Sequence, residues 1–210
     1  MTNDRSTHTI ATISRIPVKV HFSYYIFVCV ILLVCATMIS TEKLIMMLQV
    51  LVGTFWAVLF HELGHAYVAN KLKHKVRDIV IYPIGGIATI EMNRDRHGDV
   101  IKIGLAGPLV NIVLGVFLCI IPTAWTWSAG LINLFLGVGN LLPVRSFDGG
   151  LVLHSFLAST TNKCRADDIL RRLTILIVCI VAALGFYMSS LAICSVALFV
   201  FVYGILAGEE

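Results

Sequence analysis

Residues 44–69 read LIMMLQVLVGTFWAVLFHELGHAYVA, an apolar run that ends in the pattern HELGH at residues 61–65. The run is long enough to cross a bilayer, since a spanning helix needs about 20 apolar residues. On a helix, His61 and His65 share one face because they are four residues apart. Two imidazoles so placed can bind one zinc ion, and Glu62 can act as general base on a water molecule. Such groups are costly inside a membrane, so we disfavour the alternative of a polar cluster that only bonds a neighbouring helix.

The composition excludes an ordinary soluble protein. Of the 210 residues, 58% are hydrophobic and only 13% are charged, whereas a typical soluble domain has about 25% charged residues. The mean hydropathy of +0.91 agrees with this. The net charge of +4 is modest, and the basic residues adjoin apolar runs, so no nucleic-acid partner is predicted. The six cysteines form no CxxC pair, and we interpret them as small apolar residues.

Six apolar segments predict an all-α polytopic membrane protein with about six transmembrane helices. The segments are residues 22–39, 44–69, 101–121, 131–157 with a break, 173–187 and 191–207. Connections rich in Lys and Arg alternate with connections that have almost none, and the positive-inside rule then puts both termini in the cytoplasm. We expect a single membrane-embedded domain over residues 1–210, with a catalytic core at about 44–157 and a C-terminal helix pair at about 173–207.

A small β-hairpin or re-entrant sheet is predicted between the second and third spans. Residues 76–82 and 87–92 are both rich in strand-forming side chains. Pro83, Gly85 and Gly86 separate the two runs, as expected for a turn.

A third zinc ligand is expected from another span, because catalytic zinc sites usually have three protein ligands and leave the fourth position to water. Asp148 is the predicted ligand, since it lies as far from the start of its span as His61 does from the start of its own. Glu91 is the rival. We rank it lower because it lies in a basic segment outside the predicted bilayer.

Several motifs resemble those of the site-2 protease family of intramembrane zinc metalloproteases. Residues 140–150, NLLPVRSFDGG, are similar to the family pattern NxxPxxxxDGG, and HELGH matches the family's HExxH. The pair Gly85-Gly86 resembles a glycine pair between the two catalytic helices, and residues 107–111, GPLVN, resemble a GPxxN element. The motifs follow the family's order over roughly residues 10–157, and the last two spans resemble those of the family's compact six-span archaeal and sporulation-type members only in outline.

The resemblance implies a role for each motif residue. His61, His65 and Asp148 would be the zinc ligands, Glu62 the catalytic base, and Asn140 a catalytic residue near the scissile carbonyl. For Asn140 the alternative is a helix-end cap before Pro143. For Asn111 a functional role and a structural role in helix packing are equally favoured. Arg145 stands where the family is expected to have an apolar residue, and the sequence assigns it no role.

The function expected from the resemblance is that of an intramembrane zinc endopeptidase with Zn²⁺ as cofactor. It would cleave transmembrane or juxtamembrane segments of membrane proteins, in regulated intramembrane proteolysis at the cell membrane. A membrane zinc transporter or sensor that uses the same ligands without hydrolysis is the alternative. An inactive relative and a zincin-type protease with a Glu ligand are less favoured. The sequence predicts neither the substrate nor the oligomeric state, the gating mechanism or the cleavage-site preference.

Overall fold

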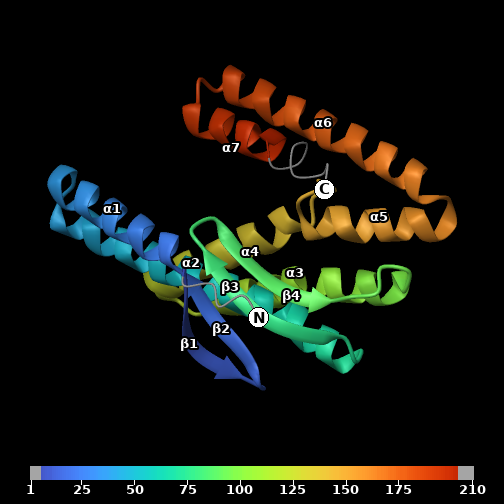
Figure 1. The fold of residues 1–210 in the computed structure, drawn as a ribbon. Coiled ribbons are helices and arrows are strands. Elements are labelled where there is room, and N and C mark those ends of the chain that lie inside the picture. The colour runs from blue at the N-terminus through green and yellow to red at the C-terminus, as the bar shows by residue number, and fades with distance from the viewer. Residues whose placement is uncertain (1–5, 203–210) are drawn as a thin grey trace. The chain divides into compact units, whose positions relative to one another are not determined.

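The computed structural model describes residues 6–202, which fold into helices and one small sheet (Figure 1). In chain order the elements are β1 (Thr7–Ile13), β2 (Ile16–His21), α1 (Phe22–Met38), α2 (Thr41–Lys71), β3 (Lys75–Tyr82), β4 (Gly85–Glu91), α3 (His97–Ile120), α4 (Ala124–Asn140), α5 (Asp148–Thr160), α6 (Lys163–Tyr187) and α7 (Leu191–Phe201). The chain is therefore mostly helical, as predicted.

The predicted count of about six transmembrane helices is not confirmed. Among the described residues, three helices are long and apolar enough to span a membrane: α2 with 31 residues, α3 with 24 and α6 with 25. The first predicted span falls on α1, which has only 17 residues. The last falls on α7, and its final part, residues 203–207, lies outside the described residues. The prediction counted apolar residues. A helix perpendicular to the membrane needs about 20 continuous helical residues to cross the hydrocarbon core of about 30 Å.

The predicted break in the fourth span is confirmed. Residues 131–157 divide into α4, which ends at Asn140, and α5, which begins at Asp148. Pro143 lies between them, has no N–H to donate and disfavours helical geometry at Leu142. Residues 141–147 form an irregular linker, named here the 141–147 linker.

The sheet has four strands in the order β1-β2-β3-β4. The predicted hairpin is confirmed as the antiparallel pair β3–β4. The N-terminal hairpin β1–β2 was not predicted, and it joins the sheet through a parallel pairing of β2 with β3. Its two-residue loop, Ser14-Arg15, has positive φ at both positions, 51° and 68°, which suits the right-handed twist of the strands.

The sheet is fixed to α2 by two apolar clusters. Val18 and Val20 of β2 pack with Ile81 of β3 against Val58 and Leu59 of α2. A second cluster joins Ile16, Ile79 and Ala66 at the other end of the histidine pair. Because these clusters flank residues 61–65, the sheet has a defined position beside the HELGH turn.

The described residues group into two compact units. One lies within Met1–Met92 and Ala106–Gly137, and holds the sheet, α1, α2 and most of α3 and α4. The other lies within Asn93–Leu105 and Val138–Glu210, and holds the start of α3, the 141–147 linker, α5, α6 and α7. The single domain over residues 1–210 remains a prediction.

We expect Lys19→Met to destabilise the sheet at neutral pH and to have less effect in acid. Lys19 Nζ lies 2.6 Å from Asp78 Oδ2 and joins β2 to β3. Partial burial alone would raise the pKa of Asp78, but hydrogen bonds from Lys19 and Thr89 and the charges of Lys19 and Arg77 lower it below 3.8. The ion pair therefore contributes stability above the ordinary pKa of Asp and loses it as the pH falls through the depressed value.

The measurement is thermal unfolding of both proteins in detergent. The variant should lose about 1–2 kcal/mol at about pH 7, because a hydrogen bond between charged groups contributes about 1.5–3 kcal/mol and partial exposure of this pair lowers that value. The difference should shrink towards about pH 3. An equal difference at both pH values would show that the pair makes no such contribution.

Candidate metal centre

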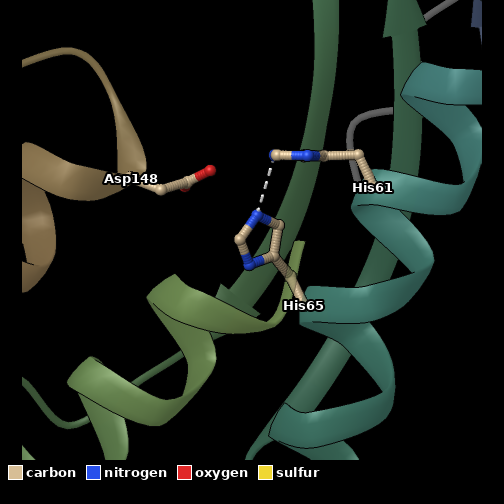
Figure 2. Close-up of side chains that lie close together, drawn as sticks. All are labelled: His61, His65 and Asp148. Carbon is tan, nitrogen blue, oxygen red and sulfur yellow. Dashed lines mark hydrogen bonds between the residues drawn. The ribbon is translucent and has the colours of Figure 1, made fainter. Parts of the chain in front are cut away.

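The two histidines of α2 come together as the helical spacing predicted. Nε2 of His61 and Nε2 of His65 lie 3.2 Å apart, and their rings meet edge to face (Figure 2). Two nitrogen ligands on a tetrahedral zinc ion, each about 2.0–2.1 Å from the metal, are separated by about 3.3 Å. Both side chains are buried, with 5% and 7% of their surface exposed. The pair therefore has the spacing and the donor chemistry that a zinc ion requires.

Gly107 of α3 makes room for these imidazoles. A Cβ atom at this position would collide with Nε2 of His65 and would lie 2.8 Å from Nε2 of His61. The next residue, Pro108, is fully buried. A bare stretch of α3 backbone thus passes beside the donor atoms, where any larger residue would displace them.

Glu62 is held by strand β4. Its Oε2 accepts a hydrogen bond of 2.9 Å from the backbone N–H of Ala88. Gly86, two residues earlier on the same strand, leaves space for it, because a Cβ there would lie 2.5 Å from Glu62 Cγ and 2.9 Å from Oε1. Like the histidines, Glu62 is buried. The hairpin therefore fixes the orientation of the one carboxylate within HELGH.

Asp148 is the first residue of α5, at the positive end of the helix dipole. The two glycines that follow it are both buried. A Cβ on Gly149 would collide with the carbonyl oxygen of Leu141, and a Cβ on Gly150 with that of Val144. The sequence DGG is thus explained locally, because the 141–147 linker folds back over the first turn of α5.

Comparison with known proteins agrees with these features. The sequence matches Peptidase family M50 over residues 49–127 and 120–184. The chain belongs to Peptidase family M50. The match includes the HELGH turn of α2, the Gly107 region of α3 and the DGG turn of α5. Three of the helices in residues 6–202 are long and apolar enough to span a bilayer, and this M50 chain is an integral membrane protein.

Two similar proteins come from Methanocaldococcus jannaschii. A zinc metalloprotease is 31% identical over 209 residues, which cover 90% of the M50 chain and 57% of that relative. The chain therefore spans little more than half the length of this curated relative. The solved structure of a site-2 protease matches with a TM-score of 0.72 at 27% identity, and the match covers 97% of the M50 chain and 95% of the solved chain. The resemblance to site-2 proteases is thereby confirmed.

The other predicted site residues of the M50 chain lie as follows. Asn140 is the last residue of α4, and Asp148 follows it after the 141–147 linker, in the same compact unit. The ligand role of Asp148 and the catalytic role of Asn140 remain predictions.

Glu91, the rival ligand, has other partners. It ends β4, is exposed, accepts a hydrogen bond from Nε of Arg77 and lies 3.5 Å from Nζ of Lys75. The Arg77 hydrogen bond is the main cause that holds the pKa of Glu91 below its usual value. A carboxylate engaged with two cations at the end of the strand is a poor candidate for a buried zinc ligand.

Sequence reasoning missed the contribution of Ala88. Its role rests on a backbone N–H, which no side-chain pattern reveals. The glycine pair at residues 85–86 was the available signal, because a glycine in a strand often marks a close approach.

Asn111 is fully buried on α3, and its side-chain amide has no hydrogen-bond partner among the described residues. The functional role and the packing role of Asn111 both remain predictions.

Proposed function

We propose that this chain is an intramembrane zinc endopeptidase that cleaves transmembrane or juxtamembrane segments of membrane proteins. The observation that carries the proposal is the buried HELGH turn. It holds two imidazole nitrogens 3.2 Å apart with a glutamate fixed beside them. Membership of Peptidase family M50, and a relative named as a zinc metalloprotease, support peptide hydrolysis as the reaction.

We propose His61, His65 and Asp148 as the three zinc ligands (Figure 2). Two neutral imidazoles and one carboxylate are a donor set that zinc accepts, and they leave the fourth position open for a water molecule. The alternative with Glu91 is disfavoured by its ion pairs with Arg77 and Lys75.

Glu62 is the proposed base. When bound, zinc supplies a Lewis acid that polarises the scissile carbonyl and lowers the pKa of a water molecule to about 7. The Glu62 carboxylate would accept the proton of the attacking water and pass it to the leaving amine. The Ala88 N–H keeps Oε2 in place during both steps. Asn140 is the proposed donor to the oxyanion, because a side-chain N–H in a dry site stabilises developing negative charge.

The substrate is proposed to bind as an extended strand. A transmembrane helix must unwind before hydrolysis, since its carbonyls are engaged in helical hydrogen bonds. β4 is an edge strand of the sheet, and its Ala88 N–H already faces the base. An unwound segment that pairs with β4 would therefore lie beside Glu62.

The proposed setting is the cell membrane, with both termini in the cytoplasm and a role in regulated intramembrane proteolysis. The alternation of basic and nearly uncharged connections supports this orientation. No observation favours a zinc transporter or sensor, because those functions give no role to Glu62 and its support from β4.

Metal analysis combined with a cleavage assay tests the proposal. The protein purified in detergent should carry one zinc ion per chain and cleave members of a panel of fluorophore-labelled single-span peptides. A chelator should abolish cleavage, and added zinc should restore it. Zinc content should be lost in His61→Ala and His65→Ala. Full zinc content without cleavage of any peptide, together with zinc uptake by proteoliposomes, would instead establish a transporter.

A further inference from the structure

The 141–147 linker connects the two residues proposed to act from the second unit, Asn140 and Asp148. An inference about this linker therefore rests on the proposed function. The linker has little regular structure of its own: Val144 N donates to Leu142 O and Phe147 N donates to Val144 O, at 2.8 and 2.9 Å. Its position must be set by the elements against which it packs.

One peptide unit of the linker lies between two helices. The carbonyl of Val144 points at Gly150 of α5, where a Cβ atom would collide with it. The N–H of the same peptide unit belongs to Arg145 and donates a hydrogen bond of 3.1 Å to Oγ1 of Thr174 on α6. The peptide unit that links Val144 to Arg145 is thus fixed from opposite sides by α5 and α6.

Thr174 is oriented for this contact by its own helix. Its Oγ1 donates to the carbonyl of Leu170, one turn earlier on α6, at 2.9 Å. This bond fixes the hydroxyl rotamer and turns a lone pair towards the linker. Thr174 is 1% exposed, so loss of its hydroxyl would remove a well-shielded hydrogen bond to the Arg145 N–H, which is costly.

The side chain of Val144 adds an apolar contact between the linker and the C-terminal helices. It is fully buried and packs against Val178 of α6 and Val200 of α7. Phe147 and Ile177 pack around this cluster. The contact holds the linker by apolar burial next to the point where Thr174 holds it by a hydrogen bond.

Arg145 stands where the family is expected to have an apolar residue, and its side chain has a partner on α6, the helix that also carries Thr174. Its Nη2 lies 3.8 Å from Oδ1 of Asp167 on α6, and Nε2 of His154 on α5 lies 3.3 Å from the same oxygen. Asp167 is half exposed, so this pair is worth little by itself. Its charges reinforce a position that Thr174 and Val144 set.

We propose that Thr174 is a positioning residue, and that α6 sets the place of Asp148 by holding the 141–147 linker through the Thr174 hydroxyl. The link runs from Thr174 to the Val144–Arg145 peptide unit, then to Gly150 and to the first turn of α5, where Asp148 lies. Thr174 itself contacts neither the substrate nor the metal. The C-terminal helix pair is then part of the catalytic apparatus, although it contributes no ligand.

Thr174→Val is the test, because valine keeps the shape and removes the hydroxyl. We expect kcat on the labelled single-span peptides to fall about tenfold, the effect of one lost hydrogen bond, with KM within about twofold. The d–d spectrum of the cobalt-substituted protein should change, and the Arg145 amide should exchange faster with deuterium in the metal-free protein. Thr174→Ser, which keeps the hydroxyl, should restore all three measurements.

Thr37→Val is the matched control, since Thr37 also bonds a carbonyl of its own helix but is exposed on α1. It should resemble the wild type in every measurement. If Thr174→Val does not fold, Val144→Ala tests the same link and should lower kcat in the same way.

A folded Thr174→Val protein with wild-type kcat, cobalt spectrum and amide exchange would overturn the inference. So would a Thr174→Ser protein as impaired as Thr174→Val. If the wild-type protein binds zinc and cleaves peptides and Thr174→Val is unaffected, only the inference about Thr174 is rejected. A wild-type protein without zinc or cleavage rejects the proposed function as well.

Discussion

Glu62→Gln should abolish peptide cleavage and leave the zinc content unchanged. The amide has the size of the carboxylate and can still accept a hydrogen bond from the Ala88 N–H, so the helix and the hairpin should keep their positions. It cannot accept the proton of the attacking water. General-base catalysis contributes about 10²–10⁴-fold to rates, and kcat should fall by that amount.

Glu91→Gln is the matched control for this experiment. Glu91 is a second carboxylate at the same hairpin, but it is exposed and bonded to Arg77. Its replacement should leave both cleavage and zinc content close to those of the wild type. Loss of zinc from Glu91→Gln would revive the rival ligand, and normal cleavage by Glu62→Gln would disprove the role of Glu62.

Gly107→Ala should remove the metal without unfolding the protein. The new methyl group would collide with Nε2 of His65 and crowd Nε2 of His61, the atoms that face one another at 3.2 Å. The imidazoles must then rotate away, because the new methyl group is attached directly to the α3 backbone and cannot turn aside. Changes that disturb ligand orientation cost about 10–100-fold in metal affinity, and direct displacement of both donors should reach at least that range.

The control lies on the same helix. A methyl group added at Gly98 of α3 would meet no atom within 4 Å beyond its chain neighbours and the backbone of its own helix, so Gly98→Ala should keep full zinc affinity. Alanine is favoured over glycine in helices by about 1 kcal/mol, so neither variant should lose helix stability through propensity. Zinc competition titrations distinguish the two variants. Equal affinity in both would mean that the Gly107 contact has no bearing on the metal site.

The part of the site that lies on one helix was predictable from the sequence. His61, Glu62 and His65 need only the helical repeat to come together, and that repeat is a local property. The break within residues 131–157 was also predictable, because the effect of Pro143 on a helix is likewise local. The strands β3 and β4 were predictable because their side chains and the intervening glycines are contiguous.

The remaining features depend on contacts between distant segments. The strand β2 shows the alternation of Ile16, Val18 and Val20 facing the core, but it is short, and its parallel pairing with β3 is decided only in the folded chain. Arg145 was recognisable as unusual, whereas its partners on α6 were not. The count of six spans is not confirmed, because apolar composition alone does not determine where helices end.

Asp148 is proposed to join His61 and His65 on one metal ion. Asp148→Cys loaded with cobalt tests this ligand role, because a thiolate bound to Co²⁺ gives an intense charge-transfer absorption band in the near ultraviolet. Asp95→Cys, an exposed position in the same unit as Asp148, controls for adventitious thiol binding. We expect the band in Asp148→Cys at one cobalt per chain, and we expect no band in the wild type or in Asp95→Cys. Cobalt bound to Asp148→Cys without that band would show that residue 148 does not reach the metal, and would rule out Asp148 as a ligand.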